Sequence, residues 1–214
     1  MSNLKVAIID YQLSNLFSVQ HACQIVGLNA SITSSPNDIS SADALILPGV
    51  GAFGDAMKNL QQFRLIDPII EHINKKKSFL GVCLGLQLLF EKSEEFGNHK
   101  GLGIFQGSVV KFPNKNSKNE MIIIPQIGWN TLKLQKKDPL LSGIKDEEFM
   151  YFVHSYYILP KDPKIILAKT VYEKIEYTSA ISQNNVFAVQ FHPEKSGTEG
   201  LKIYRNFSEI INNL

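Results

Sequence analysis

A cysteine flanked by two glycines most constrains how this chain of 214 residues can fold. Residues 78–82 form a short apolar run before Cys83, and residues 84–90 form an amphipathic run after it. This succession predicts a strand, a sharp turn and a helix, with the cysteine at the apex. Gly81 and Gly85 stand two positions before and after it, where a strained turn has no room for side chains. The pattern is that of a nucleophile elbow, and the helix N-terminus that follows favours thiolate over thiol.

The alternative interpretation of this stretch is a buried cysteine in a helix that has glycines nearby. At a glycine usage of about 7%, a given cysteine has both flanking glycines by chance about once in 200 cases. Since the chain contains only two cysteines, chance explains the pattern poorly. An elbow predicts catalysis only if a base and an orienting group are found elsewhere.

Composition and charge restrict the class of protein. With 44% hydrophobic and 20% charged residues, the chain is typical of a globular protein, and we expect a single domain over residues 1–214. The net charge of +2 does not indicate nucleic acid or an anionic membrane as a partner. Cys23 lies on an apolar helical stripe, and its spacing from Cys83 fits neither a zinc site nor a disulfide framework. No apolar run approaches the length of about 18 residues that a membrane span needs. We therefore expect a cytoplasmic protein that uses no metal or cofactor.

The order of apolar runs predicts the fold. Strands and helices alternate in the first part of the chain, which favours an α/β fold with a doubly wound, mostly parallel sheet. After Phe90 the runs shorten, and we expect an antiparallel extension there. The predicted strands lie at residues 4–9, 30–33, 44–47, 78–82, 121–124, 149–153, 165–170, 175–181 and 186–191. Helices are predicted at residues 16–26, 65–73, 84–90 and 200–211, a connector at 37–40 and a turn at 125–130.

A glycine-rich loop follows the third predicted strand. Residues 48–54 read Pro-Gly-Val-Gly-Ala-Phe-Gly. Ligands bind at that end of a parallel sheet, and such a loop can direct backbone N–H groups at a developing oxyanion. A flexible turn before a helix is an equally good interpretation. A phosphate-binding loop is excluded because no Gly-Lys-Ser/Thr follows.

His192 is the best candidate for the base that the cysteine needs. It ends the apolar run 186–191, and Glu194 follows two residues later. In an extended segment such residues point the same way, so the carboxylate can hold one imidazole nitrogen while the other faces the thiol. A surface histidine beside a glutamate is a common arrangement without function. Its coincidence with a cysteine elbow on the same sheet edge favours catalysis.

Together these motifs resemble the class I, or triad-type, glutamine amidotransferases. The likeness rests on residues 81–87, Gly-Val-Cys-Leu-Gly-Leu-Gln, and on residues 191–194, Phe-His-Pro-Glu. Further motifs are similar to those of the glutaminase subunits of imidazole glycerol phosphate synthases, and they occur in the family's order over essentially the whole chain. These motifs lie at residues 48–53, 128–130, 151–156 and 192–197.

The resemblance implies a mechanism and a set of site residues. Cys83 would attack the side-chain amide of glutamine, His192 would transfer protons, and Glu194 would hold His192. The backbone N–H groups of Val50 and Leu84 would bind the oxyanion, and the second of these is also the donor that elbow geometry predicts. The residues that would help to bind glutamine are Gly51, Gln87, Ser155 and Tyr156.

The resemblance also implies a partner. Ammonia is protonated in water near neutral pH, and we find no second active site in the sequence, so the acceptor must be bound by another chain. In the family this is a (β/α)8-barrel cyclase, and the pair makes imidazole glycerol phosphate and AICAR in histidine biosynthesis. The residues expected at the interface of such a heterodimer are Asn15, Trp129, Tyr151 and Lys195. Ordinary packing for the two aromatic residues and a solvated charge for the lysine are the alternatives.

Two motifs depart from the family pattern. Residues 10–15 read Asp-Tyr-Gln-Leu-Ser-Asn where the family usually has Asp-Tyr-Gly-Met-Gly-Asn, and residues 125–130 read Pro-Gln-Ile-Gly-Trp-Asn where it usually has Pro-His-Met-Gly-Trp-Asn. We expect both departures at the partner surface, which suggests retained chemistry with an altered partner. A paralogous subunit that supplies ammonia for sugar amidation in surface-polysaccharide biosynthesis therefore stays open. So do a non-hydrolytic cysteine sensor or chaperone, and a cysteine peptidase or esterase.

Overall fold

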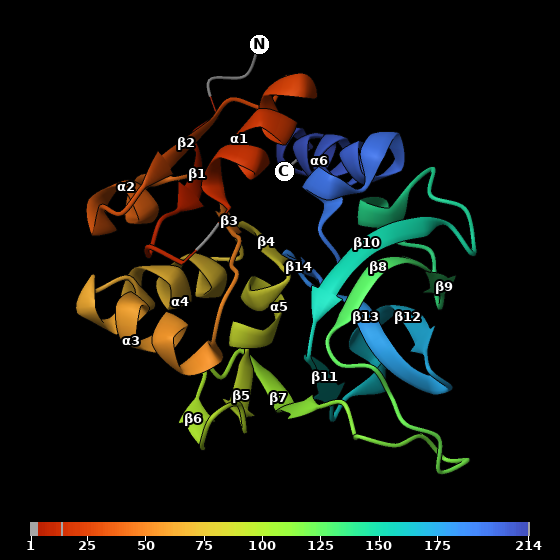
Figure 1. Cartoon of the computed structure of the whole chain (residues 1–214). Coiled ribbons are helices and arrows are strands. Elements are labelled where there is room, and N and C mark those ends of the chain that lie inside the picture. Colours follow the sequence, from red (N-terminus) through yellow and green to blue (C-terminus); the bar gives the residue numbers. More distant parts are fainter. Residues whose placement is uncertain (1–3, 14, 214) are drawn as a thin grey trace.

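The computed structural model describes residues 4–13 and 15–213 (Figure 1). Within them, five parallel strands form one half of the main sheet in the order β2-β1-β3-β4-β14, with β2 at the edge. Their bounds are β1 (Val6–Ile9), β2 (Ala30–Thr33), β3 (Ala44–Leu47), β4 (Ser78–Val82) and β14 (Val186–Val189). Short apolar runs rich in β-branched residues suit strands that are covered on both faces.

The sheet continues beyond β14 with largely antiparallel strands. Their order is β13-β11-β7-β5-β6, with β12 joined to β13 and β9 joined to β12. Among these strands in the described residues, β5 and β7 pair in parallel and the other pairs are antiparallel. The strands are β13 (Ile175–Gln183), β11 (Tyr156–Pro160), β7 (Phe105–Lys111), β5 (Phe90–Ser93), β6 (His99–Lys100), β12 (Ile166–Tyr172) and β9 (Lys133–Leu134). The prediction of a mostly parallel, doubly wound α/β sheet with an antiparallel extension is confirmed.

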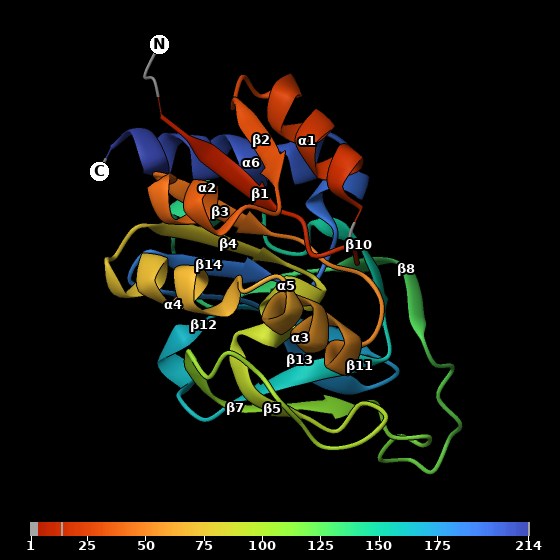
Figure 2. The ribbon, with the colours of Figure 1, turned by 90° about the vertical axis from the view of Figure 1, so that its left-hand side faces the viewer.

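Helices cover both faces of the parallel strands (Figures 1 and 2). Val6 and Ile8 of β1 belong to one apolar core and Ala7 and Ile9 to the other, because successive side chains in a strand point to opposite faces. The first core packs under α1 (Leu16–Ile25) and α6 (Gly197–Asn212). The second packs under α2 (Pro36–Ser41), α3 (Phe53–Gln62), α4 (Ile66–Asn74) and α5 (Leu84–Leu88).

Several local predictions were wrong for identifiable reasons. The connector expected at 37–40 is helix α2, since Ser35 caps it by accepting from the N–H of Asp38 and Pro36 begins it. The helix expected over 84–90 ends at Leu88 because Phe90 begins β5. The strand expected at 121–124 is reduced to an isolated bridge.

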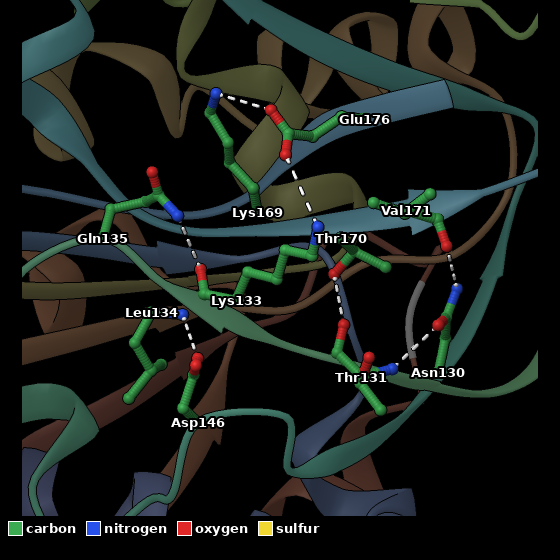
Figure 3. Close-up of polar contacts among 10 residues, drawn as sticks. All are labelled: Asn130, Thr131, Lys133, Leu134, Gln135, Asp146, Lys169, Thr170, Val171 and Glu176. Carbon is green, nitrogen blue, oxygen red and sulfur yellow. Dashed lines mark hydrogen bonds and ion pairs between the residues drawn. The ribbon is translucent and has the colours of Figure 1, made fainter. Parts of the chain in front are cut away.

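A separate antiparallel ribbon stands beside the extension. The turn expected at 125–130 is its strand β8 (Gln126–Thr131), paired with β10 (Phe149–His154). Figure 3 shows how the end of β8 is attached to β12. Asn130 Nδ2 donates to the carbonyl oxygen of Val171 at 2.9 Å, and Thr170 Oγ1 donates to that of Thr131 at 3.0 Å. These bonds fix the position of the ribbon relative to the main sheet.

Among the helices in the described parts of the chain, none has the length and apolarity to cross a bilayer.

Candidate active site

Cys83 occupies a strained turn between β4 and α5. Its backbone angles are φ 55° and ψ −107°, a region that costs energy for a residue with a Cβ atom. Its N–H donates to the carbonyl oxygen of Val189 at 2.8 Å, which ties the turn to the neighbouring strand. A Cβ atom on Gly85 would lie 1.8 Å from the carbonyl oxygen of Leu47, and one on Gly81 would lie 3.0 Å from the carbonyl carbon of Gly85. The close approach of the backbone segments therefore requires these glycines, as the sequence pattern predicts.

His192 and Glu194 lie beyond the end of β14, where the short helix η3 (Pro193–Lys195) begins. The imidazole Nδ1 is 2.7 Å from Glu194 Oε1, and both side chains are fully buried. Asn15 Nδ2 also donates to Oε1, and the Tyr204 hydroxyl donates to Oε2 at 3.1 Å. Three donors from separate parts of the chain thus hold one carboxylate in a fixed orientation.

Electrostatics favours a protonated imidazole at this site. Burial alone would lower the pKa of His192, but the charges of Cys83 and Glu194 and the hydrogen bond to Glu194 outweigh it and raise that pKa to about 10. Burial of Glu194 would raise its pKa, yet the hydrogen bond and charge of His192, with the Asn15 amide, keep it below its usual range. The imidazole Nε2 is buried and has no hydrogen-bond partner within the described residues. It is the nitrogen left to act on the sulfur.

The titration of His192 is expected to depend on the sulfur. In the wild-type chain its imidazole should titrate at about pH 10 by NMR, and Cys83→Ala should lower the midpoint by at least about one unit because the largest favourable charge is removed. An unchanged midpoint would show that sulfur and imidazole are not coupled. Since the folded-state pKa is raised, the stability that His192 contributes is complete below its ordinary value of 6.5 and is lost as pH rises through about 10.

A cavity of about 310 Å³ opens beside the elbow. It is lined by Cys83 and by every residue expected to bind glutamine or the oxyanion: Val50, Gly51, Leu84, Gln87, Ser155 and Tyr156. Lys195, expected at the partner surface, also lines it. A larger cavity of about 730 Å³, along residues 134–144, contains none of these residues.

The two backbone groups expected to bind an oxyanion are engaged elsewhere in this structure. The N–H of Val50 donates to the carbonyl oxygen of Leu13 at 3.0 Å. The N–H of Leu84 makes a longer contact, 3.4 Å, with the carbonyl oxygen of Gly49. The loop therefore presents no pair of open donors to the cavity in this conformation.

Three polar residues that line the cavity or contact the sulfur were not found from the sequence. Glu95 lines the cavity, and its Oε2 accepts from the N–H of Phe53 at 2.6 Å. His154 lines it too; burial lowers its pKa to about 4, so it is neutral. Gln190 Nε2 lies 3.7 Å from the sulfur of Cys83. The position of Gln190 two residues before His192, and that of His154 within the motif at residues 151–156, could have suggested these two residues. Glu95 comes from a segment with no distinctive spacing.

The residues expected at a partner surface form a cluster at the ribbon. The rings of Trp129 and Tyr151 pack edge to face with centroids 6.1 Å apart, and Lys195 Nζ lies 6.0 Å from the Tyr151 ring centre. Trp129 is 56% exposed, and Ile127 and Phe149 beside it on the same face are exposed as well. The outward face of this ribbon is therefore apolar and accessible.

One expectation about this surface is wrong, and one residue expected there has a further contact. The side chain of Asn15 donates to Glu194. Gln126, the departure expected at the partner surface, is buried, and its Oε1 accepts from the Tyr177 hydroxyl at 2.9 Å. In the other departing motif, Gln12 is exposed, whereas Ser14 lies outside the described residues.

Comparisons with known proteins show the family of the chain. The model of the family "Glutamine amidotransferase class-I" matches residues 7–210. The chain is 49% identical to the imidazole glycerol phosphate synthase subunit HisH of Aquifex aeolicus, over 95% of this chain and 96% of that protein. It is 50% identical to the same subunit of Caldanaerobacter subterraneus subsp. tengcongensis, over 96% of this chain and 98% of that protein.

Solved structures share the fold at low sequence identity. A structure described as a glutamine amidotransferase superposes with a TM-score of 0.74 at 18% identity, covering 97% of this chain and 98% of that chain. The PurLQS structure from Thermotoga maritima superposes with a TM-score of 0.73 at 19% identity, covering 98% of this chain and 99% of that chain. With the extent of the family match and the identity to its HisH members, these findings show that the chain belongs to the class I glutamine amidotransferases, a family of enzymes.

Proposed function

We propose that this chain is the glutaminase subunit of a cytoplasmic imidazole glycerol phosphate synthase, acting as one domain over residues 1–214. It hydrolyses glutamine to glutamate and ammonia and passes the ammonia to a (β/α)8-barrel cyclase partner, with imidazole glycerol phosphate and AICAR as products in histidine biosynthesis. The observation that carries the proposal is the buried His192–Glu194 pair coupled to Cys83 at the rim of the cavity. The HisH relatives favour histidine biosynthesis over the surface-sugar alternative.

The reaction divides into two acyl transfers. The sulfur of Cys83 bonds to the side-chain carbonyl carbon of glutamine, and the imidazolium of His192 gives a proton to the amide nitrogen as its bond to carbon breaks. Ammonia leaves and a thioester remains. Water then attacks the thioester carbon, His192 takes a proton from it, and glutamate is released. Glu194 stays ionised throughout and stabilises the imidazolium, because three donors hold it.

The oxyanion that forms in both steps requires a change in the loop at residues 48–52. Val50 and Leu84 are the proposed donors, yet their N–H groups are bonded to the carbonyl oxygens of Leu13 and Gly49. Turning the loop would exchange these bonds for bonds to the oxyanion. The free subunit is therefore expected to be a slow glutaminase that partner and acceptor ligand accelerate.

Glu95 and Gln87 are suited to hold the α-ammonium group of glutamine. The nitrogen of Gln87 donates to the carbonyl oxygen of Tyr156 and to Gln190 Oε1, both at 3.0 Å, so its side-chain oxygen is the atom it can offer to the cavity. Glu95 adds a carboxylate at the same wall. The side-chain oxygen of Gln87 and the carboxylate of Glu95 together favour the α-ammonium group of glutamine over its α-carboxylate.

Glu95→Gln is expected to raise the KM for glutamine by about tenfold or more while kcat changes less, because the lost charge contacts a group remote from the reacting bond. Steady-state kinetics of the complex with its partner measures this. Glu94→Gln is the matched control, since Glu94 is exposed and does not line the cavity. A fall in kcat with KM unchanged would contradict the assignment.

The ribbon is the proposed docking surface for the cyclase. Its exposed apolar face suits a stable interface, and it is linked directly to the active site: the N–H of His192 donates to the carbonyl oxygen of Tyr151 at 2.9 Å. Lys195 and Asn15 extend the same surface toward the cavity and Glu194.

Trp129→Ala is expected to weaken binding of the cyclase subunit by about 30-fold, the loss that follows removal of a central aromatic anchor. Calorimetric titration of one subunit with the other measures it. Phe96→Ala removes an aromatic ring that is also exposed but lies outside the ribbon, and it should bind like wild type. Equal losses in the two variants would place the interface elsewhere.

The proposed function is tested by measuring glutamate release from the isolated chain, from its complex with the cyclase, and from the complex with the acceptor ligand bound. We expect the rate to rise at each step. No turnover in any of the three would refute a glutaminase and favour the sensor or chaperone alternative. Turnover that only a sugar-amidating partner stimulates would favour the surface-polysaccharide alternative.

A further inference from the structure

We propose that Gln190 is a catalytic residue: its side-chain N–H binds the sulfur of Cys83 and stabilises the thiolate, while Gln87 is a positioning residue that fixes the direction of this bond. The inference rests on the proposed function, because it assigns a role in the same nucleophile. It does not follow from the triad, since neither glutamine takes part in the proton transfers described above.

The position of Gln190 is fixed by its surroundings. It is fully buried, directly after β14, and its N–H donates to the carbonyl oxygen of Ser179 at 2.8 Å. This backbone bond continues the pairing of β14 with β13 and directs the side chain toward the elbow. There Nε2 lies 3.7 Å from the sulfur of Cys83, within the distance of an N–H···S hydrogen bond.

The neighbours of Gln87 determine which end of the Gln190 amide faces the sulfur. Tyr156 offers a backbone carbonyl oxygen, which can only accept, so Gln87 must direct its nitrogen there. The second proton of that nitrogen points to Gln190 Oε1 at 3.0 Å. A rotated Gln190 would place two NH2 groups against each other. The amide therefore keeps its oxygen toward Gln87 and its N–H toward the sulfur.

An N–H donor at this point favours the charged form of the sulfur, because a thiolate accepts hydrogen bonds more strongly than a thiol. The other groups that act on Cys83 are the imidazolium of His192, which attracts the thiolate, and the hydroxyls of Tyr11 and Tyr177, which stay protonated because burial raises their pKa values. Glu95 and Lys195 face the same cavity with opposite charges. Of these groups, Gln190 makes a side-chain N–H hydrogen bond to the sulfur, whereas His192 acts on it through its charge.

The test is the pH profile of Cys83 alkylation by iodoacetamide, followed by mass spectrometry in the full chain. Gln190→Met keeps the length of the side chain and removes the donor, and we expect its midpoint to move up by about one pH unit. Gln190→Glu keeps the shape and replaces the donor by a carboxylate, so its midpoint should move up at least as far. Midpoints equal to wild type in folded variants would overturn the proposal.

Asn206→Leu is the matched control. Asn206 is a buried amide in α6 that donates to the carbonyl oxygens of Leu140 and Ser142, both at 2.8 Å, and its substitution should leave the midpoint unchanged. An equal shift in this variant would show a nonspecific effect and overturn the assignment.

A measurement on the wild-type chain covers the case in which neither Gln190 variant folds. The side-chain amide resonance of Gln190 should titrate with the midpoint of Cys83 alkylation, and that titration should be absent in Cys83→Ala. A Gln190 amide resonance that does not shift at this midpoint would overturn the proposal.

Alkylation of Cys83 does not require glutamine turnover, so failure of the Gln190 proposal can be distinguished from failure of the proposed function. Unchanged midpoints with normal turnover refute only the role of Gln190, whereas shifted midpoints without turnover refute only the proposed function.

Discussion

Cys83→Ala is expected to reduce glutamine-dependent synthesis by the complex at least about ten-thousand-fold, which is the size of loss seen when a covalent nucleophile is removed. His192 and Glu194 cannot replace the sulfur, because they are committed to each other as an ion pair. Coupled assays with the cyclase and its acceptor ligand measure the loss. External ammonia should support the partner's reaction at the wild-type rate, since the variant affects supply of ammonia and not its use.

Cys23→Ala is the control for this result. Cys23 is buried in α1, and burial raises its pKa to about 12, so it is a thiol that packs in the core. Its substitution should leave glutamine-dependent activity within a few-fold of wild type. If ammonia-driven synthesis fell as far as the glutamine-driven reaction in Cys83→Ala, the role in ammonia delivery would be wrong.

His192→Asn is expected to lower glutamine-dependent activity by about ten-thousand-fold, again with ammonia-dependent synthesis retained. The substitution removes the proton donor to the leaving nitrogen and the charge that stabilises the thiolate. It also leaves the carboxylate of Glu194 buried with two donors, Asn15 and Tyr204, in place of three.

The matched control is His72→Asn. His72 is also buried, and burial lowers its pKa to about 4; its Nε2 is 3.0 Å from the carbonyl oxygen of Ser78. Its substitution should lower thermal stability and leave turnover close to wild type. Because loss of a buried hydrogen bond affects both variants, a comparable loss of turnover in the two would mean that His192 acts only through stability.

The parallel half of the fold and the elbow could be predicted because local pattern determines them. Buried parallel strands need continuous apolar runs, and a turn in which Gly85 passes close to the backbone of Leu47 admits no side chain. The spacing of His192 and Glu194 likewise made their proximity predictable. At these positions the fold requires one type of residue, such as glycine in the elbow, or one spacing along the chain, and both can be read from the sequence.

What the sequence did not reveal depends on contacts between distant segments. Residues 125–130 contain proline and glycine and suggest a turn, yet pairing with β10 makes most of this segment a strand. Asn15 is far along the chain from Glu194, and nothing near it indicates a buried carboxylate as its acceptor. The inward direction of Gln126 depends on Tyr177, which belongs to another strand. Such pairings depend on tertiary packing, and the spacing of apolar residues along the chain does not predict them.

Covalent trapping by an electrophilic glutamine analogue, with mass spectrometry to locate the adduct, shows directly whether Cys83 is a glutamine-specific nucleophile. We expect one adduct per chain on Cys83, lost in Cys83→Ala and blocked by excess glutamine. Peptide-like electrophiles should not react. An adduct on Cys23, or equal labelling by peptide-like probes, would contradict a glutamine-specific nucleophile at the elbow.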